Sequence, residues 1–281
     1  MQKMKKMITW VLCFAMFASL VVLTGCGSEK KEASKKVLKV GMECGYAPFN
    51  WTQTTDENGA VKIAGTSEYA YGYDVIMAKK LAESMGYDLE IHKIEWDGLA
   101  PAVSSGKIDA VIAGMSITSK RKESVDFSSV YYNASIVALT QKDSPFANAK
   151  NVADLKGAVA TSQLNTIWYD LIKQIPDAKI QPAIDNVPGM IVALASGKVQ
   201  VLVLDKPTAM AAAFSNPNLV MLDFKDGKGF EASQEDVEMG IAVKKGNSDL
   251  LKQLNEKLGS ISESDRNKMM EEAIQKQPLS K

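Results

Sequence analysis

The sequence predicts an α/β protein made of two similar lobes, and three observations support this. Short apolar runs alternate with amphipathic helical segments from residue 37 onward. The helix-to-strand passage at Ala102–Ala113 is similar to Val192–Val203, and the Ser-Gly-Lys at Ser105–Lys107 is matched by Ser196–Lys198. A chain of this length also supports two modest cores better than one large core.

The first lobe is predicted over residues 37–137 together with 241–275. Its strands are expected at Val37–Gly41, Leu89–Ile94 and Ala110–Ala113, and its helices at Asp74–Met85 and Leu99–Ser105. Asp74 is expected to cap its helix, and Gly86 ends that helix. In both copies of the repeated passage the glycine suits the left-handed residue that ends a helix.

The second lobe is predicted over residues 138–240. Ile136–Thr140 should cross into it and Ile241–Val243 should cross back, so two strands form the hinge. Strands are expected at Ala158–Thr161 and Val199–Leu204, and helices at Thr166–Ile175, Pro188–Ser196 and Pro207–Phe214. The segments Asp249–Ser260 and Asp265–Ile274 should pack on the first lobe.

The N-terminus predicts export and a lipid anchor. Residues 1–25 are typical of a signal peptide, because three lysines precede the apolar stretch Met7–Leu23 and no stop-transfer pattern follows. The sequence Leu23-Thr24-Gly25-Cys26 is similar to a bacterial lipobox, in which Cys26 carries acyl chains such as palmitate and becomes the mature N-terminus. The alternative is a plain secretory signal cut at another small residue. Residues 26–36 form a polar tether, so the mature protein is expected on the extracytoplasmic face of the cell membrane.

Composition, the cysteines and the single histidine argue against several kinds of function. Without residues 1–25 the chain carries three more acids than bases, and no basic stripe with interleaved aromatics predicts a nucleic-acid partner. Cys13 leaves with the signal and Cys26 carries lipid, so Cys44 has no disulfide partner and is interpreted as a small half-buried thiol rather than a nucleophile. His92 is the only histidine, which argues against a catalytic triad or a zinc site. No catalytic residue, metal or cofactor is therefore expected.

Donor groups gather just beyond the strand at Ala110–Ala113. They are the backbone of Gly114, the hydroxyls of Ser116 and Thr118, Ser119 as the expected cap of a short helix, and Arg121 in its first turn. Open α/β sheets bind ligands at the carboxyl ends of their parallel strands. The segment predicts a site for a small carboxylate, the alternative being that Arg121 is one solvated base within Lys120–Lys122.

The second copy of the passage ends differently, at the lone carboxylate Asp205 before Lys206 and Pro207. One lobe therefore offers a positive group and the other a negative group. A zwitterion satisfies both, and the α-amino acid backbone is the obvious candidate.

Several motifs in this order resemble the family 3 extracellular solute-binding proteins, the amino-acid receptors of bacterial ABC importers. The resemblance covers Val37–Ala273 and rests on Gly45–Phe49, Gly72–Val75, Trp96–Leu99, Gly114–Arg121 with Val125–Ser128, and Leu204-Asp205. It implies a type II periplasmic-binding-protein-like fold, with two lobes joined by two hinge strands.

The resemblance also implies roles at matching positions. Arg121 should clasp the ligand α-carboxylate with help from Ser116 and the backbone of Gly114, while Asp205 takes the α-ammonium. Tyr46 and Trp96 fall where the family sandwiches the ligand side chain, although core packing is the alternative for both.

Two positions depart from the family pattern. Thr166 is expected as a further carboxylate donor, but Asn165 stands before it where the family usually has glycine. The stretch Trp51–Tyr71 is longer than the usual loop.

Glu43 lies where the family often places an acidic group facing the distal end of the ligand, with a solvated position at the cleft rim as the alternative.

The predicted function follows from these roles. The protein is expected to be a monomeric, lipid-anchored receptor that binds a free L-amino acid by hinge closure and delivers it to the membrane subunits of an ABC importer. Glu43 favours a basic amino acid, with glutamine or another polar amino acid second. The alternatives are a dehydratase similar to cyclohexadienyl dehydratase on the same fold, and a ligand-sensing receptor component.

Overall fold

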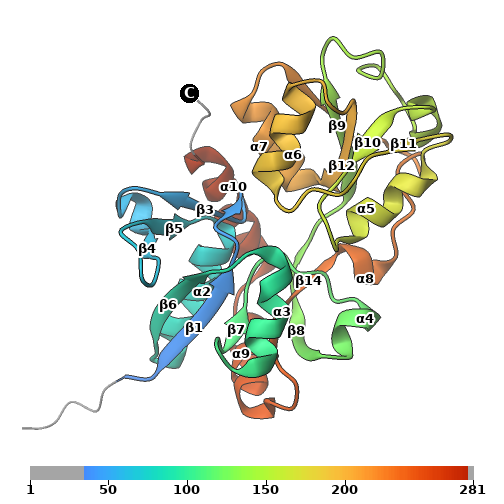
Figure 1. Ribbon diagram of the computed structural model, residues 1–281. Helices are drawn as coiled ribbons and strands as arrows, with labels where there is room; N and C mark the ends of the chain where they lie inside the picture. Colours follow the sequence, from blue (N-terminus) through green and yellow to red (C-terminus); the bar gives the residue numbers. More distant parts are fainter. Residues whose placement is uncertain (1–34, 278–281) are drawn as a thin grey trace, which may run out of the picture. The chain divides into compact units, whose positions relative to one another are not determined.

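The computed structural model describes residues 35–277, and within this range the chain forms three β-sheets (Figure 1). The predicted signal peptide, Cys26 and nearly all of the tether lie outside the described residues. Among residues 35–277, no helix is both long enough and apolar enough to cross a membrane.

The first sheet has five strands in the order β6-β1-β7-β14-β8. Its strands are β1 (Val37–Met42), β6 (Asp88–Lys93), β7 (Ala110–Val111), β8 (Val125–Asn133) and β14 (Glu238–Lys244). β1 pairs in parallel with β6 and β7, while β14 runs antiparallel to β7 and β8. The apolar residues of β1 from Leu38 onward and those of β7 are buried, as a strand covered on both faces requires, whereas Val37 at the start of β1 is exposed.

The second sheet repeats this arrangement strand by strand, in the order β11-β10-β12-β9-β13. Its strands are β9 (Ile136–Gln141), β10 (Val159–Thr161), β11 (Lys179–Ile180), β12 (Val201–Asp205) and β13 (Leu219–Leu222). β10 pairs in parallel with β11 and β12, and β9 is antiparallel to β12 and β13. We call the part built on the first sheet lobe 1 and the part built on the second sheet lobe 2. The two equivalent sheets confirm the predicted two-lobed α/β fold.

The repeated sequence passage occupies equivalent places in the two lobes. In each, a helix ends, a glycine follows with positive φ (80° at Gly106 and 72° at Gly197), and the central strand β7 or β12 comes next. A left-handed residue after a helix favours glycine because glycine has no Cβ.

A third, four-stranded sheet was not predicted from the sequence. It has the order β2-β3-β5-β4, with β2 (Gly45–Tyr46), β3 (Asn50–Gln53), β4 (Val61–Lys62) and β5 (Tyr69–Tyr71), and the short 3-10 helix η1 (Glu57–Gly59) lies between β3 and β4. The long stretch Trp51–Tyr71 therefore forms most of a small antiparallel sheet at the edge of lobe 1 (Figure 1).

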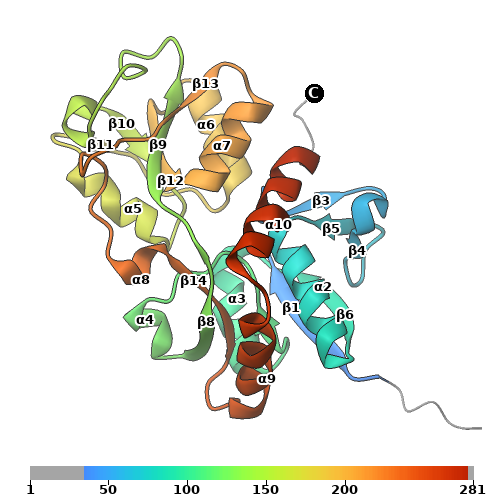
Figure 2. The ribbon, with the colours of Figure 1, turned by 180° about the vertical axis from the view of Figure 1, so that it is seen from behind.

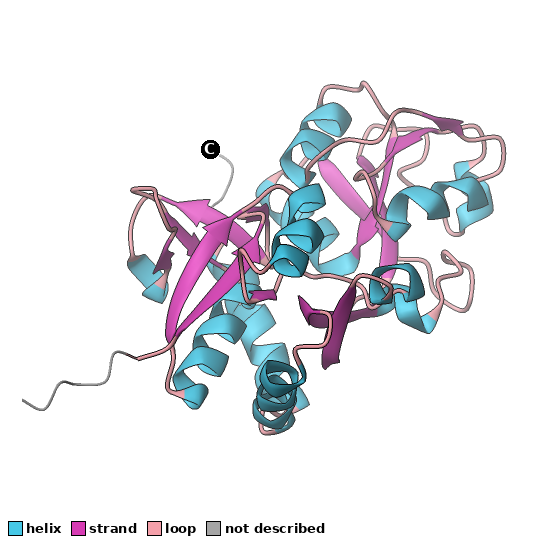
Figure 3. Cartoon of the chain, turned by 60° about the horizontal axis from the view of Figure 1, so that its bottom comes forward, coloured by secondary structure: helices cyan, strands magenta, loops and turns pink. Residues whose placement is uncertain are grey.

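Most of the predicted helices lie close to their predicted ranges, but the one predicted at Leu99–Ser105 begins at Trp96 and the one predicted at Thr166–Ile175 ends at Leu171. The longer helices are α2 (Tyr73–Met85), α3 (Trp96–Ser105), α5 (Ile167–Leu171), α6 (Val187–Ala195), α7 (Lys206–Ser215), α9 (Ser248–Gly259) and α10 (Glu263–Lys276). The shorter ones are α4 (Ser119–Lys122), α8 (Gln234–Val237), η2 (Val152–Leu155) and η3 (Ile172–Gln174). Figure 3 shows helices packed beside the strands in both lobes.

Two predicted helix caps were wrong. The cap of α4 is Thr118, whose side chain accepts the N–H of Arg121, and Ser119 is the first helical residue. The cap of α2 is Gly72, and Asp74 lies inside the first turn with its side chain directed into the core. There the Asp74 carboxylate accepts hydrogen bonds from Tyr131 Oη at 2.7 Å and Asn50 Nδ2 at 2.8 Å.

The chain passes between the lobes twice. The first crossing joins β8 to β9 at Ala134 and Ser135, and the second runs from β13 through α8 to β14 (Figure 2). The Ala134 N–H donates to the Val237 carbonyl at 3.0 Å, so the two crossings are hydrogen-bonded to each other. Residues 37–137, 138–240 and 241–275 remain predicted lobe limits.

Candidate functional site

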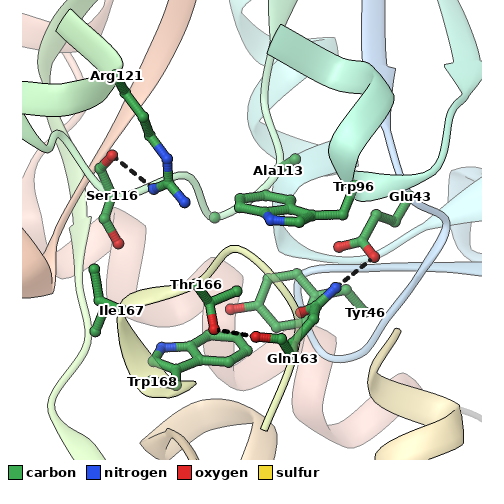
Figure 4. A pocket seen from close by; sticks show the side chains of 11 residues that line it. Glu43, Tyr46, Trp96, Ala113, Ser116, Arg121, Gln163, Thr166, Ile167 and Trp168 are labelled. Carbon is green, nitrogen blue, oxygen red and sulfur yellow. Dashed lines mark hydrogen bonds between the residues drawn. The ribbon is translucent and has the colours of Figure 1, made fainter. Parts of the chain in front are cut away.

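One pocket gathers seven of the eight ligand-binding residues predicted from the sequence (Figure 4). They are Glu43, Tyr46, Trp96, Gly114, Ser116, Arg121 and Thr166, and Ala113, Gln163, Ile167 and Trp168 complete the lining. The first six come from lobe 1 and Thr166 from lobe 2, so the pocket lies between the two sheets, at the carboxyl ends of β1, β7 and β10. This is where parallel α/β sheets place their ligands.

Arg121 is held in place by groups around its guanidinium. Nη1 donates to the Ser116 carbonyl at 2.9 Å, and the guanidinium carbon lies 5.0 Å from the centre of the Trp96 ring. Nη2 donates to the Asn165 carbonyl of lobe 2 at 3.3 Å. Burial lowers the pKa of Arg121 to about 10, so the group stays charged at neutral pH. The side chain is thus a fixed cation on the pocket wall rather than a solvated base.

Gly114 gives the pocket space, and its N–H makes a hydrogen bond within lobe 1. Its φ is +60°, and a Cβ there would lie 2.6 Å from Tyr46 Cε1, so only glycine lets the Tyr46 ring approach. The Gly114 N–H donates to Tyr131 Oη at 2.8 Å, and that hydroxyl donates to Asp74. The N–H that was expected to help a ligand carboxylate is therefore committed to the core in this structure.

Asp205 lies behind the pocket wall, in contact with Tyr46. The carboxylate is fully buried; Oδ1 accepts the N–H of Thr208 at 2.9 Å and so caps α7, while Oδ2 accepts the Tyr46 hydroxyl at 2.9 Å. Burial raises the pKa of Asp205 to about 6, against the opposing effect of these hydrogen bonds. The Tyr46–Asp205 hydrogen bond joins lobe 1 to lobe 2, and of its two partners Tyr46 lines the pocket.

Tyr46 is also packed into the core by its ring. The ring stacks on Phe49 with centroids 4.7 Å apart and lies 6.0 Å from the Trp168 ring. In Figure 4, Trp96 lies on one side of the pocket, while Tyr46 and Trp168 lie on the other. Aromatic surfaces therefore face the pocket from both lobes.

Glu43 is an ionisable side chain placed where little water reaches it. It follows β1, is only 7 % exposed, and accepts a hydrogen bond from Gln163 Nε2 of lobe 2 at 2.9 Å. Burial raises the pKa of Glu43 to about 7, the Gln163 bond lowers it, and the charges of Glu95, Asp74 and Asp97 raise it further. The rim position considered from the sequence does not fit this burial.

Thr166 is the N-cap residue of α5, but its side chain makes no capping hydrogen bond. Its hydroxyl donates to the Gln163 carbonyl at 2.7 Å, and the side chain is 8 % exposed. Asn165, the residue before it, has a φ of +56°, the left-handed conformation that glycine or asparagine adopts at least cost. Asparagine therefore keeps the backbone that a glycine would give.

Sequence reasoning missed four lining residues. Gln163 and Trp168 flank the predicted Thr166, Ile167 lies between Thr166 and Trp168, and Ala113 ends the apolar run before Gly114. Their closeness to a predicted site residue was the only available signal. Nothing in the local sequence shows that the Gln163 amide reaches Glu43, 120 residues away along the chain.

Cys44 and His92, which were considered from the sequence as reactive or metal-binding residues, do not line the pocket. Cys44 is buried and burial raises the pKa of its thiol to about 12, which makes it a poor nucleophile. His92 pairs with Glu90 at 2.6 Å on β6. Within residues 35–277, no group of three or more histidine, cysteine or acidic side chains is placed to hold a metal ion.

Known proteins with similar sequences include amino-acid-binding proteins. The arginine-binding extracellular protein ArtP of Bacillus subtilis is 29 % identical over 227 residues, covering 79 % of this chain and 83 % of that protein. A probable histidine-binding protein of Campylobacter jejuni is 32 % identical over 237 residues, covering 81 % and 85 %.

Solved structures agree in fold. An amino acid ABC transporter substrate-binding protein from Streptococcus pneumoniae bound to L-arginine superposes with a TM-score of 0.74 at 26 % identity, covering 85 % of this chain and 94 % of that one. The ancestral amino-acid-binding protein AncCDT-1, a precursor of cyclohexadienyl dehydratase, gives a TM-score of 0.68 at 31 % identity, covering 85 % and 95 %.

The family model that describes bacterial extracellular solute-binding proteins, family 3, matches residues 38–275, which is nearly the whole of the described chain. This chain belongs to that family.

Proposed function

We propose that this protein binds a free amino acid with a cationic side chain and presents it to the membrane subunits of an ABC importer. The observation that carries the proposal is the pairing of opposite charges in one buried pocket, with Arg121 on one wall and the buried carboxyl of Glu43 on another. The arginine-binding and histidine-binding relatives support it.

The α-carboxylate of the ligand would bind at Arg121. A guanidinium has five N–H donors, and two of them serve the carbonyls of Ser116 and Asn165. The other three can donate to a carboxylate. The hydroxyls of Ser116 and Thr166 line the same pocket, and in this structure they donate to the carbonyls of Asp236 and Gln163. A charge-assisted fork of this kind is stronger than neutral hydrogen bonds.

The α-ammonium would be balanced by Asp205. Each carboxylate oxygen has two lone pairs, so Oδ2 can accept an ammonium in addition to the Tyr46 hydroxyl. The ammonium would favour the ionised form of Asp205, whose pKa of about 6 in the structure already leaves it mostly charged at neutral pH.

The side chain of the ligand would extend between the aromatic rings toward Glu43. Trp96 on one side, with Tyr46 and Trp168 on the other, offers flat surfaces to a guanidinium or an imidazolium (Figure 4). A cationic end would pair with Glu43, whereas an aliphatic side chain would leave this buried carboxyl with Gln163 alone. Glutamine or another polar amino acid is the second candidate, because an amide can also donate to Glu43.

Ligand binding would hold the two lobes together. Arg121 and Glu43 belong to lobe 1, and Asp205 and Thr166 to lobe 2, so only a closed arrangement brings both sets to one ligand. We further propose that Cys26 carries the lipid that keeps a monomeric receptor at the outer face of the membrane, beside its importer.

The pocket supports binding rather than catalysis. Glu43, with its pKa near 7, is the pocket carboxyl best suited to proton transfer, yet its hydrogen-bond partner Gln163 carries an amide that cannot relay a proton. The test is to incubate the protein with a cyclohexadienyl amino-acid precursor and follow dehydration. Turnover above the spontaneous rate would establish the dehydratase alternative.

Isothermal titration with the twenty common amino acids tests the proposed function directly. Arginine, lysine or histidine should bind most tightly, and the tightest ligand should raise the midpoint of thermal unfolding by mass action. Tight binding of leucine or glutamate with no response to the three basic amino acids would refute the cationic assignment.

A further inference from the structure

One residue of lobe 2, Asn165, contacts three residues of lobe 1. Its side-chain Nδ2 donates to Asp97 Oδ1 at 2.9 Å. Its backbone carbonyl accepts from Arg121 Nη2 at 3.3 Å and from Trp96 Nε1 at 3.4 Å. Asp97 and Trp96 both belong to the first turn of α3, so a single asparagine spans from the loop before α5 to the start of α3 and to Arg121.

The backbone of Asn165 makes these contacts possible. A φ of +56° turns the carbonyl toward the Arg121 and Trp96 donors while the side chain reaches Asp97. Most residues are destabilised in this conformation, whereas glycine and asparagine adopt it readily. Glycine would present the same carbonyl, so what asparagine adds is the amide bonded to Asp97.

Asn165 lies next to the pocket, where its carbonyl can position two residues of the lining. Asn165 is exposed, and it precedes Thr166, which lines the pocket. Its carbonyl is bound by both members of the Arg121–Trp96 stack, so it fixes the guanidinium from the opposite lobe.

We infer that Asn165 is a positioning residue that latches the two lobes at the rim of the pocket and holds Arg121 and Trp96 in their binding arrangement. This inference rests on the proposed function, because it assigns to Asn165 the control of how slowly the bound amino acid leaves. The hydrogen bond between Asn165 and Asp97 exists only while the lobes are together. Its loss should therefore speed the opening of the lobes and the dissociation of the ligand, and leave the association rate nearly unchanged.

Stopped-flow measurement of L-arginine binding to Asn165→Gly tests the latch. This variant keeps the positive φ and the carbonyl but removes the amide. One exposed hydrogen bond to a carboxylate corresponds to about a 3- to 10-fold faster dissociation rate, with the association rate within about 2-fold of the unsubstituted protein. Asn58→Gly is the matched control, because Asn58 also has a positive φ but lies in η1, and it should leave both rates unchanged.

An exchange of the two partners separates a latch from a general structural effect. Asn165→Asp alone places two carboxylates together and should speed dissociation more than Asn165→Gly does. Adding Asp97→Asn restores the hydrogen bond with donor and acceptor reversed, and the dissociation rate should return to within about 2-fold of the original. Failure of the double variant to recover, or an unchanged rate in Asn165→Gly, would overturn the inference.

A measurement without ligand distinguishes the latch from the proposed function. If none of the common amino acids binds the unsubstituted protein, the proposed function fails. The latch is then decided by small-angle scattering of the ligand-free protein, in which Asn165→Gly should show a larger radius of gyration than the unsubstituted protein. Equal values would refute the latch.

Discussion

The buried carboxyl of Glu43 makes the affinity for a cationic ligand depend on pH. In the structure its pKa is about 7, mainly because of burial, so about half of the molecules carry a proton there at pH 7. A guanidinium or ammonium favours the ionised form, so binding should release that proton. The affinity should therefore rise with pH up to about 7 and level off above it.

The size of the effect follows from the ionised fraction. At pH 6 only about one molecule in eleven would have Glu43 ionised, which weakens arginine binding about 10-fold relative to pH 8. Asp205, with a pKa of about 6, adds roughly a further factor of two at pH 6. At pH 7 binding should release about half a proton from Glu43, which calorimetry in buffers of different ionisation enthalpy measures directly.

Glu43→Gln isolates this contribution. The glutamine keeps the size of the side chain but removes the charge, and loss of one partner of a buried charged pair costs about 2–5 kcal/mol, or roughly 30-fold to several-thousand-fold in arginine affinity. The remaining pH dependence should shrink to the factor from Asp205, and binding of glutamine should weaken much less. Arginine affinity of the variant within threefold of the original, or an original affinity equal at pH 6 and pH 8, would refute the reasoning.

Three further predictions concern the other charged groups and the anchor. Arg121→Lys keeps the charge but loses the two-pronged donor, so amino-acid affinity measured by calorimetry should fall about 30-fold or more, and a change under threefold would remove Arg121 from the site. Cys26→Ala should move the protein out of the membrane fraction, as followed by immunoblotting; an exported original protein that is wholly soluble would contradict the anchor. The ligand-free protein should lose about 5 kcal/mol of unfolding free energy between pH 5 and pH 7.5, measured by urea denaturation, because the raised pKa values of Glu43, Asp74 and Asp205 mean that the folded state binds more protons in this window. A stability that stays level or rises over this range would show that these carboxyls do not control it.

The regular elements of both lobes could be predicted from the sequence because their signals are local. The ends of α6 and α9 lie within one residue of the predicted limits, since apolar periodicity and a capping asparagine or a following glycine define them. The strands β2 to β5 carried no such signal, because most are short and pair only with one another.

The pocket was predicted less completely than the fold. Arg121 and Glu43 could be found because each follows an apolar strand at the ligand-binding edge of a parallel sheet. Contacts between the lobes, such as Gln163 with Glu43 or Asn165 with Asp97, join residues far apart in the chain, and no sequence pattern encodes their distance. The same holds for Asp74. Aspartate is common at helix starts, so the sequence predicted a helix cap and not the buried hydrogen bond that the Asp74 carboxylate accepts from Tyr131.

The order of strands in the two sheets has a consequence for how the chain folds. The second sheet is assembled entirely from residues 136–222, one continuous stretch, whereas the first sheet needs β14 between β7 and β8. In a chain that folds from its N-terminus, β7 and β8 must therefore lack β14, the strand between them, until residue 244 is available. The second sheet can already be complete at that stage. Pulsed amide hydrogen exchange during refolding should accordingly protect β10 and β12 before β7 and β8, because closing the longer loop to β14 is the slower step.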